Sequence, residues 1–352
     1  MTISPPLDLS PRPSPTAPQV QVGNARDLHL YLPARSVDAI VTSPPYWRKR
    51  DYGHPDQLGQ EQTPDEYVTS LLAVMSRWKA LLKPTGSLLI NIADSYRHHR
   101  LVGIPSLLEV RAAQQGWRLA HRIIWAKDSG VPEAHARLAQ RHEFILHFAW
   151  RRAYHVDLFD FAQRYGEGAK PGNVWTVRST LHRGDHLAPF PEDLARRMIV
   201  LACPERVCAA CGRPLVRLIE RGEQLNETRP QARRAMALYR ESGLTPEHLA
   251  AIRATGISDA GKAQRVQRGA GQNSARTQHL AAEAKAALGG YFREFTFAQP
   301  VQQGWAACPC GARAFEAGLV VDPFAGTGTT LRAAHALGRR SFGLDLSPPH
   351  YP

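Results

Sequence analysis

The sequence lacks a long apolar run: none of its 352 residues falls in a stretch that is apolar for long enough to cross a bilayer. The first twenty residues are rich in Pro and Ser and lack the apolar core of a secretory signal, so residues 1–20 are expected to form a disordered tail. These two absences predict a cytoplasmic protein that does not act at a membrane.

Cysteine is scarce as well, because the chain has five in all, too few for a disulfide framework in a chain of this length. Four of them form two close pairs, Cys208 with Cys211 and Cys308 with Cys310. The first pair has the spacing of a zinc knuckle, and the second is tighter. If the pairs meet in space, they close a four-cysteine zinc site; the alternative is a set of reduced cysteines without metal. Cys203 is expected to be a core residue.

Acidic residues are outnumbered: 31 Asp and Glu stand against 44 Lys and Arg, which gives a formal net charge of +13. A positive field of this size favours nucleic acid as the partner, with solubility alone as the other interpretation. Between about residues 212 and 300, strand-like runs disappear and Arg is interspersed with Ala and Gln. This segment predicts a helical or partly ordered insertion.

Elsewhere, short apolar runs alternate with polar or helix-periodic segments. A capping box with Pro at the first helical position, at residues 63–66, opens a helix that is expected to end at residues 83–86. The runs expected to be strands are residues 37–41, 87–92, 122–125, 143–148, 319–321 and 341–344. This alternation predicts an α/β domain.

A glycine loop follows the strand at residues 319–321. Gly326 and Gly328 have no Cβ, so the backbone can approach a charged cofactor closely, and the helix that follows points free N–H groups at it. Asp345 ends the next strand, where a carboxylate accepts hydrogen bonds from ribose hydroxyls. The third glycine of the dinucleotide fingerprint is absent, which weakens a nicotinamide or flavin site and leaves an ordinary tight turn as the alternative.

A second loop, Ser43-Pro44-Pro45-Tyr46, follows the first predicted strand. The exocyclic amine of cytosine or adenine is a poor nucleophile, so an enzyme must orient and polarise it. The Ser43 hydroxyl and the Pro44 carbonyl, stiffened by Pro45, can each accept one amine hydrogen. Tyr46, with Trp47 beside it, offers a face on which an extruded base can stack. Alone, the loop is better explained as a rigid surface turn, but the glycine loop reverses this preference and favours the catalytic interpretation.

Together, Thr42-Ser43-Pro44-Pro45-Tyr46-Trp47 and the run from Asp322 to Thr330 resemble the two signature motifs of the amino-DNA methyltransferases. The catalytic loop precedes the cofactor loop, an order similar to the circularly permuted beta arrangement of the cytosine-N4 and adenine-N6 branches. The resemblance covers most of residues 22–207 and 318–347. It implies a Rossmann-like, S-adenosylmethionine-dependent methyltransferase fold.

By this resemblance the catalytic residues are Ser43, Pro44, Pro45 and Tyr46. The S-adenosylmethionine pocket is expected to include Asn24, Phe190, Asp322, Phe324, Gly326, Gly328, Thr329 and Asp345. Family members usually carry Asp where this chain has Asn24, so an amide would have to serve there.

The resemblance also suggests a division of the chain. After the tail at residues 1–20, residues 21–207 form the catalytic half of the methyltransferase domain and residues 312–352 its cofactor-binding half. Residues 208–311, bounded by the cysteine pairs, form a basic insertion that is expected to be stapled by structural Zn²⁺ and to contribute to target recognition.

The predicted function is site-specific methylation of the cytosine N4 amine in double-stranded DNA, in restriction-modification or epigenetic marking. A Ser at position 43 is typical of the cytosine-N4 branch, whereas the adenine branch usually has Asp or Asn. A restriction endonuclease acting on the same site is the expected partner in the first setting. The alternatives are an adenine-N6 DNA methyltransferase, an RNA or protein methyltransferase, and a zinc-dependent DNA-binding protein that has lost catalysis.

Overall fold

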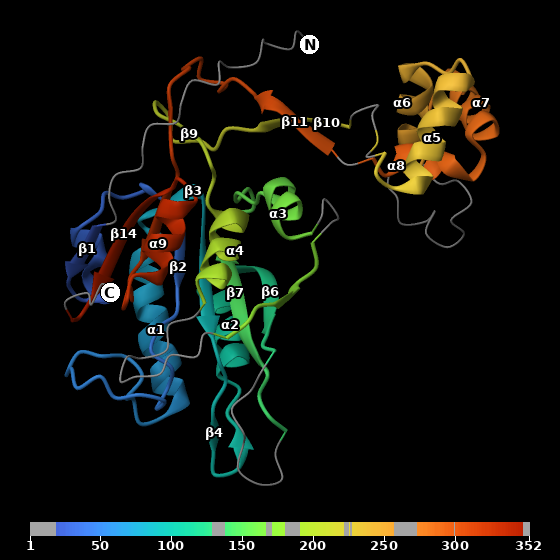
Figure 1. Ribbon diagram of the computed structural model, residues 1–352. Helices are drawn as coiled ribbons and strands as arrows, with labels where there is room; N and C mark the ends of the chain where they lie inside the picture. Colours follow the sequence, from blue (N-terminus) through green and yellow to red (C-terminus); the bar gives the residue numbers. More distant parts are fainter. Residues whose placement is uncertain are drawn as a thin grey trace. The chain divides into compact units, whose positions relative to one another are not determined.

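The computed structural model describes residues 19–128, 138–166, 171–179, 191–221, 225, 227–256, 273–298 and 300–347 (Figure 1). The chain forms two compact units: unit 1 comprises Met1–Val216 with Ala306–Pro352, and unit 2 comprises Arg217–Trp305. Both cysteine pairs belong to unit 1, so the compact insertion is narrower than the predicted span of 208–311. Among the described residues, no helix is both long enough and apolar enough to span a membrane.

Unit 1 is built on an eight-stranded sheet with the order β1-β14-β13-β2-β3-β7-β6-β8. Neighbouring strands are parallel, except that β7 runs antiparallel to β3 and β6. The strands are β1 (Gln19–Val22), β2 (Val37–Thr42), β3 (Leu82–Ile92), β6 (Arg118–Ala126), β7 (His142–Ala149), β8 (Val174–Thr176), β13 (Leu319–Asp322) and β14 (Arg340–Asp345). The predicted α/β fold is confirmed. Residues 19 and 20, placed in the tail by the sequence, begin β1, and residues 1–18 lie outside the described part.

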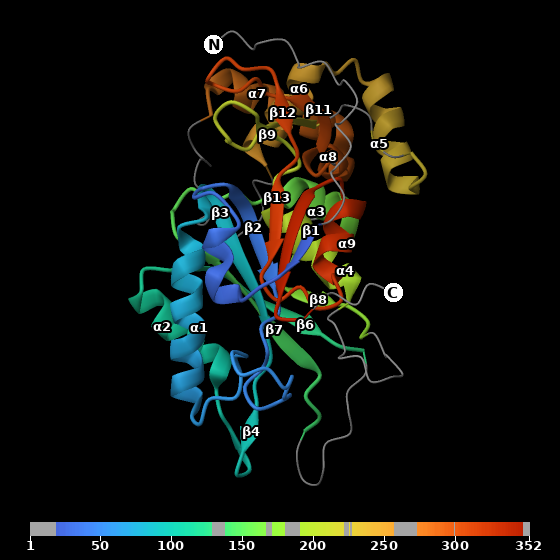
Figure 2. The ribbon, with the colours of Figure 1, turned by 90° about the vertical axis from the view of Figure 1, so that its left-hand side faces the viewer.

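Helices cover both faces of this sheet (Figure 2). One face carries α1 (Pro64–Lys79), α2 (Ile104–Gln114) and the 3-10 helix η1 (Ala25–Leu30); the other carries α3 (Leu158–Tyr165), α4 (Glu192–Ala202) and α9 (Thr329–Ala336). Successive side chains of a strand point to opposite faces. Accordingly, Ile40 of β2 joins the core cluster of Trp78, while the adjacent Val41 joins that of Ile199. Unit 1 is therefore a three-layer α/β domain.

Helix α1 begins as predicted, since Thr63 and Glu66 form a reciprocal capping box. Its predicted end at residues 83–86 is wrong, because the helix ends at Lys79 and those residues belong to β3. The Lys83 ammonium lies 2.9 Å from both Asp38 carboxylate oxygens, and Leu82 pairs with Val37 of β2. Pairing with β2 and a buried ion pair thus override the local turn signal of Pro, Thr and Gly.

Three two-stranded ribbons account for the other strands in the part of the chain that the structure describes. In unit 1, β4 (Tyr96–Arg97) pairs with β5 (Arg100–Leu101), and β9 (Val207–Cys208) pairs with β12 (Phe315–Glu316). In unit 2, β10 (Arg217–Arg221) pairs with β11 (Pro300–Trp305). The sequence missed β10, because its two apolar residues, Leu218 and Ile219, are adjacent and flanked by Arg and Glu in a segment that otherwise indicates helix.

The rest of unit 2, as far as the structure describes it, is mainly helical, in line with the helical or partly ordered insertion predicted for this segment. Its helices are α5 (Pro230–Glu241), α6 (Pro246–Thr255), α7 (Ala275–Leu288), the 3-10 helix η3 (Gly289–Tyr291) and α8 (Phe292–Thr296). They enclose a small core of their own, in which Met236, Leu249, Ile252 and Phe295 are buried. Unit 2 therefore has a hydrophobic core of its own, as expected of an insertion that folds as a separate compact unit.

Candidate active site

The two sequence motifs meet at one edge of the sheet. Strands β2 and β13 are parallel neighbours, with Ala39 opposite Val320 and Ile40 opposite Val321. The Pro-Pro loop follows β2 and the glycine loop follows β13, so both lie beyond the carboxyl ends of adjacent strands. This is where open α/β sheets bind their ligands.

Asp322 joins the end of β2, where the Pro-Pro loop begins, to the glycine loop and the start of α9. Its carboxylate accepts hydrogen bonds from the Thr42 hydroxyl at 2.6 Å, the Thr330 hydroxyl at 2.6 Å and the Phe324 N–H at 3.0 Å. Burial raises the pKa of the Asp322 carboxyl to about 6, although the bonds from Thr330, Thr42 and Phe324 act in the opposite direction. Predicted as a cofactor residue, Asp322 is seen to lie beneath the loops and to fix one to the other.

The glycine loop adopts the conformation for which glycine is needed. Gly326 and Gly328 have φ of +48° and +75°, in the left-handed region, and Gly328 is the N-cap of α9. The Gly326 N–H donates to an Asp345 carboxylate oxygen at 2.7 Å, and the Ser347 N–H donates to the other at 3.1 Å. Each oxygen keeps further acceptor capacity, so Asp345 can still accept from a ligand hydroxyl.

Two more of the predicted cofactor residues lie close to this loop. The Gly23 N–H donates to the Asp345 carbonyl at 2.8 Å, which places Asn24 next to the end of β14. Asn24 is the N-cap of η1, and its amide oxygen accepts from the Arg26 N–H at 2.9 Å. Phe324 is half-buried, with its ring edge-on to Trp78 at 5.9 Å between centroids.

Of the remaining two predicted cofactor residues, Thr329 is buried and Phe190 is not described. Thr329 is buried, and its hydroxyl lies 3.3 Å from that of Thr327 within the same loop. Phe190 lies outside the described residues. The structure therefore brings Asn24, Phe324 and Asp345 together around the two glycines, with Asp322 and Thr329 underneath.

Contacts with α1 and with residues 59–61 hold the Pro-Pro loop in place. The Tyr67 hydroxyl of α1 donates to the Pro45 carbonyl at 2.9 Å, and Gly59 packs so closely that an added Cβ would lie 3.1 Å from the Tyr46 carbonyl. The indole of Trp47 donates to the Glu61 carbonyl at 2.9 Å, and only 3% of Trp47 is exposed. Trp47 is therefore part of the core, and the stacking face expected of it beside Tyr46 is not available.

A polar network that the sequence did not assign surrounds Tyr46. The Tyr46 hydroxyl donates to Glu143 at 2.6 Å and accepts from the Asn91 amide at 2.8 Å, while the Ser43 hydroxyl lies 3.3 Å away. Lys127 lies 2.5 Å from the second Glu143 oxygen. Asn91 carried a signal, because it is the single polar residue in a strongly apolar run. Glu143 lies in the run Arg141-His142-Glu143, which also fits the family template, but no role was assigned to it, since its contact with Tyr46 depends on strand pairing.

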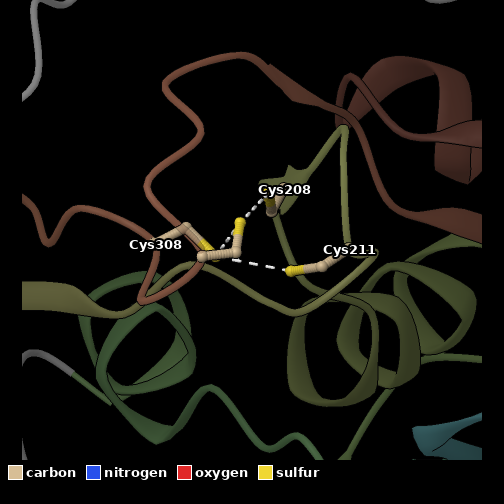
Figure 3. Close-up of side chains that lie close together, drawn as sticks. Cys208, Cys211 and Cys308 are labelled. Carbon is tan, nitrogen blue, oxygen red and sulfur yellow. Dashed lines mark hydrogen bonds between the residues drawn. The ribbon is translucent and has the colours of Figure 1, made fainter.

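The four cysteines of the two pairs converge (Figure 3). Their sulfur atoms all lie within 4.8 Å of one another, with Cys208 3.5 Å from Cys310 and Cys211 3.4 Å from Cys308. Four thiolates about 2.3 Å from a tetrahedral zinc ion would have sulfurs roughly 3.8 Å apart, so the cluster has the size of such a site. The expectation that the pairs meet is confirmed, and Cys203 is a buried core residue as predicted.

A model of the N6/N4 DNA methylase family matches residues 37–207 and 312–351. The chain belongs to this family. It is an amino-DNA methyltransferase, as the two motifs predicted. The match covers both loops and leaves out residues 208–311.

Curated relatives agree with this assignment, and a solved structure matches the fold. The chain is 30% identical to the type II methyltransferase M.Cfr9I of Citrobacter freundii over 51% of this chain and 70% of the relative. It is 32% identical to M.XycI of Xanthomonas campestris pv. cyanopsidis over 50% and 70%. The PvuII DNA methyltransferase, described as cytosine-N4-specific, matches the fold with a TM-score of 0.54 at 15% identity, over 95% of this chain and 84% of that one. The methyltransferase fold is thus confirmed.

Proposed function

We propose that this DNA methyltransferase transfers a methyl group from S-adenosylmethionine to the N4 amine of cytosine in double-stranded DNA. The observation that carries the proposal is the Asp322 carboxylate, which holds the Pro-Pro loop and the glycine loop together at one edge of the sheet. A methyl donor at one loop and a target base at the other would then be placed for direct transfer.

The glycine loop fits S-adenosylmethionine, which supplies a methyl group on a sulfonium. An added Cβ at Gly326 would meet no atom within 4 Å, so the loop backbone is open to a ligand. The N–H groups at the start of α9 point out of the helix end, and the half-buried Asp345 carboxylate can accept from ribose hydroxyls. Asn24 and Phe324 would line the same pocket.

On the other side, Ser43 and Pro44 would accept the two amine hydrogens of a base flipped out of the duplex. The held amine attacks the methyl carbon, so that the nitrogen–carbon bond forms as the sulfur–carbon bond breaks, and the amine loses one hydrogen as a proton. No covalent bond to the enzyme is needed. The fixed loop geometry supplies the alignment that such a displacement requires.

Ser43 favours cytosine over adenine, by analogy with the family branches in which Ser or Asp and Asn stand at this position. Adenine-N6 methylation is the second candidate, because the family model spans both chemistries. Nucleoside mass spectrometry of DNA from cells expressing the protein tests the choice. We expect N4-methylcytosine; N6-methyladenine without N4-methylcytosine would overturn the cytosine assignment.

Two accessory roles belong to the same proposal. Unit 2, with more Lys and Arg than Asp and Glu, would contact the target DNA. The cysteine cluster would hold a structural Zn²⁺ near the two points at which the chain enters and leaves unit 2.

A restriction endonuclease that cuts the same site is the proposed partner, since the similar relatives are named type II methyltransferases. The predicted cytoplasmic location stays a prediction.

A further inference from the structure

The polar network around Tyr46 has no part in the chemistry described so far. It lies under the catalytic loop, and it is built from three different strand ends: Asn91 from β3, Lys127 from just after β6 and Glu143 from β7. Asn91 and Glu143 are buried. Buried polar groups are costly unless their hydrogen bonds are satisfied, so such a network fixes the orientation of each group in it.

The single hydrogen of the Tyr46 hydroxyl is committed to Glu143. The 2.6 Å distance is typical of a hydroxyl that donates to a carboxylate, and Lys127 forms an ion pair with the other carboxylate oxygen. Burial and the negative charge of Glu143 raise the pKa of Tyr46 well above its usual range, so Tyr46 keeps this hydrogen. Tyr46 is a donor toward Glu143 and toward no other group.

The Tyr46 oxygen can therefore only accept from its other neighbours. Asn91 takes one direction, because its amide nitrogen lies 2.8 Å from both the Tyr46 oxygen and Glu143. A flipped amide would turn its oxygen toward the carboxylate, which is repulsive. The direction that remains faces Ser43, at 3.3 Å, so Ser43 must donate its own hydrogen to Tyr46.

We propose that Glu143 is a positioning residue that acts through Tyr46 to keep the Ser43 hydroxyl turned as an acceptor for the amine of the target base. With its hydrogen directed at Tyr46, the Ser43 oxygen presents its lone pairs, which the N–H groups of the base amine require. This inference rests on the proposed methyl transfer. It adds a reason why the loop needs Tyr46 beyond its aromatic face.

The test is a double-mutant cycle on single-turnover methyl transfer to DNA from labelled S-adenosylmethionine. Tyr46→Phe removes the acceptor that orients Ser43, and Glu143→Gln removes the charge that fixes Tyr46. Each should slow transfer by about 10- to 100-fold, the size expected for one hydrogen bond to a charged group. On a Ser43→Ala background, the same two changes should slow transfer by no more than about threefold, because the oriented hydroxyl is already gone.

Tyr165→Phe is the matched control, because it removes a tyrosine hydroxyl from α3, whose helix packs against the opposite face of the sheet from α1. It should transfer methyl groups at the rate of the unchanged protein. The S-adenosylmethionine dissociation constant of Tyr46→Phe should also stay close to that of the unchanged protein. Its melting temperature should fall, because the buried Asn91 and Glu143 each lose a hydrogen-bond partner. If Glu143→Gln does not fold, because Lys127 then lacks its partner, Tyr46→Phe carries the test, since it leaves that ion pair in place.

The outcomes separate this inference from the proposed function. If the unchanged protein transfers no methyl group to any DNA, the proposed function fails. If it methylates DNA while Tyr46→Phe and Glu143→Gln slow transfer equally with and without Ser43, the network supports the loop independently of Ser43 and the inference is overturned. Unchanged rates in both single variants would overturn it as well.

Discussion

Asp322 shows how one buried carboxylate can serve two loops that are far apart in the sequence. Its bond to Thr42 spans 280 residues of chain, and its other two bonds come from Phe324 in the glycine loop and from Thr330 in the first turn of α9. Burial disfavours the charged form, which is why the pKa rises to about 6 even though three donors favour ionisation. The loops are therefore joined by a group whose charge is costly near neutral pH.

This pKa predicts a pH dependence of stability. Because the folded-state pKa lies above the ordinary value of 3.8, folding favours the neutral acid, and that contribution is full below pH 3.8 and lost as the pH rises through 6. Asp322→Asn removes the titration. From about pH 4 to about pH 7.5, the free energy of unfolding of the variant should rise relative to the unchanged protein by about 2 to 3 kcal/mol.

Denaturant unfolding of both proteins across this range measures the difference, in which the other titrating groups cancel. A difference that does not change with pH would contradict the raised pKa. At acid pH the two proteins should differ least in stability, since a protonated carboxyl and an amide each offer one carbonyl acceptor and a donor to the surrounding hydroxyls.

At the scale of elements, the turn from β13 through the glycine loop into α9 packs on β14 at a glycine. An added Cβ at Gly343 would lie 2.8 Å from the Ala325 Cβ and 3.1 Å from the Leu331 side chain. In dinucleotide-binding loops the third glycine permits this close packing of helix on strand. Here the third glycine of the loop motif is missing, and Gly343 on the next strand provides the space.

Gly343→Ala should therefore push the glycine loop and α9 away from β14. We expect it to lower the free energy of unfolding by about 1 to 3 kcal/mol, as over-packing does, and to weaken S-adenosylmethionine binding. Thermal unfolding and calorimetric titration measure the two effects. Gly290→Ala in unit 2 is the matched control, because its Cβ would meet no atom within 4 Å, and it should change neither. Full cofactor affinity in Gly343→Ala would contradict this account of the loop.

The elements also show what local sequence could and could not predict. The strand predicted at residues 37–41 differs from β2 by one residue, because a β-branched run before two prolines is a local signal. The predicted end of α1 was wrong because Lys83 belongs to β3 and pairs with Asp38 of β2, a contact between segments that are distant in the sequence. Ser43 and Gly326 were assigned to the site because each lies in a local sequence motif. Glu143 was not assigned to the site, because its contact with Tyr46 arises from pairing between strands. Its approach to Tyr46 depends on the register of β3 and β7, in which Asn91 faces Ile145.

At the scale of the whole molecule, the cysteine cluster joins the chain segment that precedes unit 2 in the sequence to the segment that follows it. Its two cross-pairs span 102 and 97 residues. Protein purified under reducing conditions should contain one zinc ion per chain, and Cys211→Ser should lose it. The loss should lower the melting temperature, because metal binding contributes directly to the stability of such small sites.

Metal analysis by atomic emission, with thermal unfolding of both proteins, makes this measurement. Cys203→Ala is the control, because Cys203 is buried away from the cluster, and this variant should keep its zinc. Absence of zinc from fresh, reduced protein would contradict the site.

The strand order also determines when the protein can become active during its synthesis. Strand β1 pairs with β14, and β2 pairs with β13 on one side. These two early strands therefore cannot complete their pairing until β13 and β14 have been synthesised. A nascent chain that has not yet reached Asp345 has an unpaired β1, an open edge on β2 and no glycine loop. Contacts between such distant segments form late and slowly. Methylation by this protein must therefore begin only after the ribosome has passed β14, and every product truncated before Leu319 should be inactive.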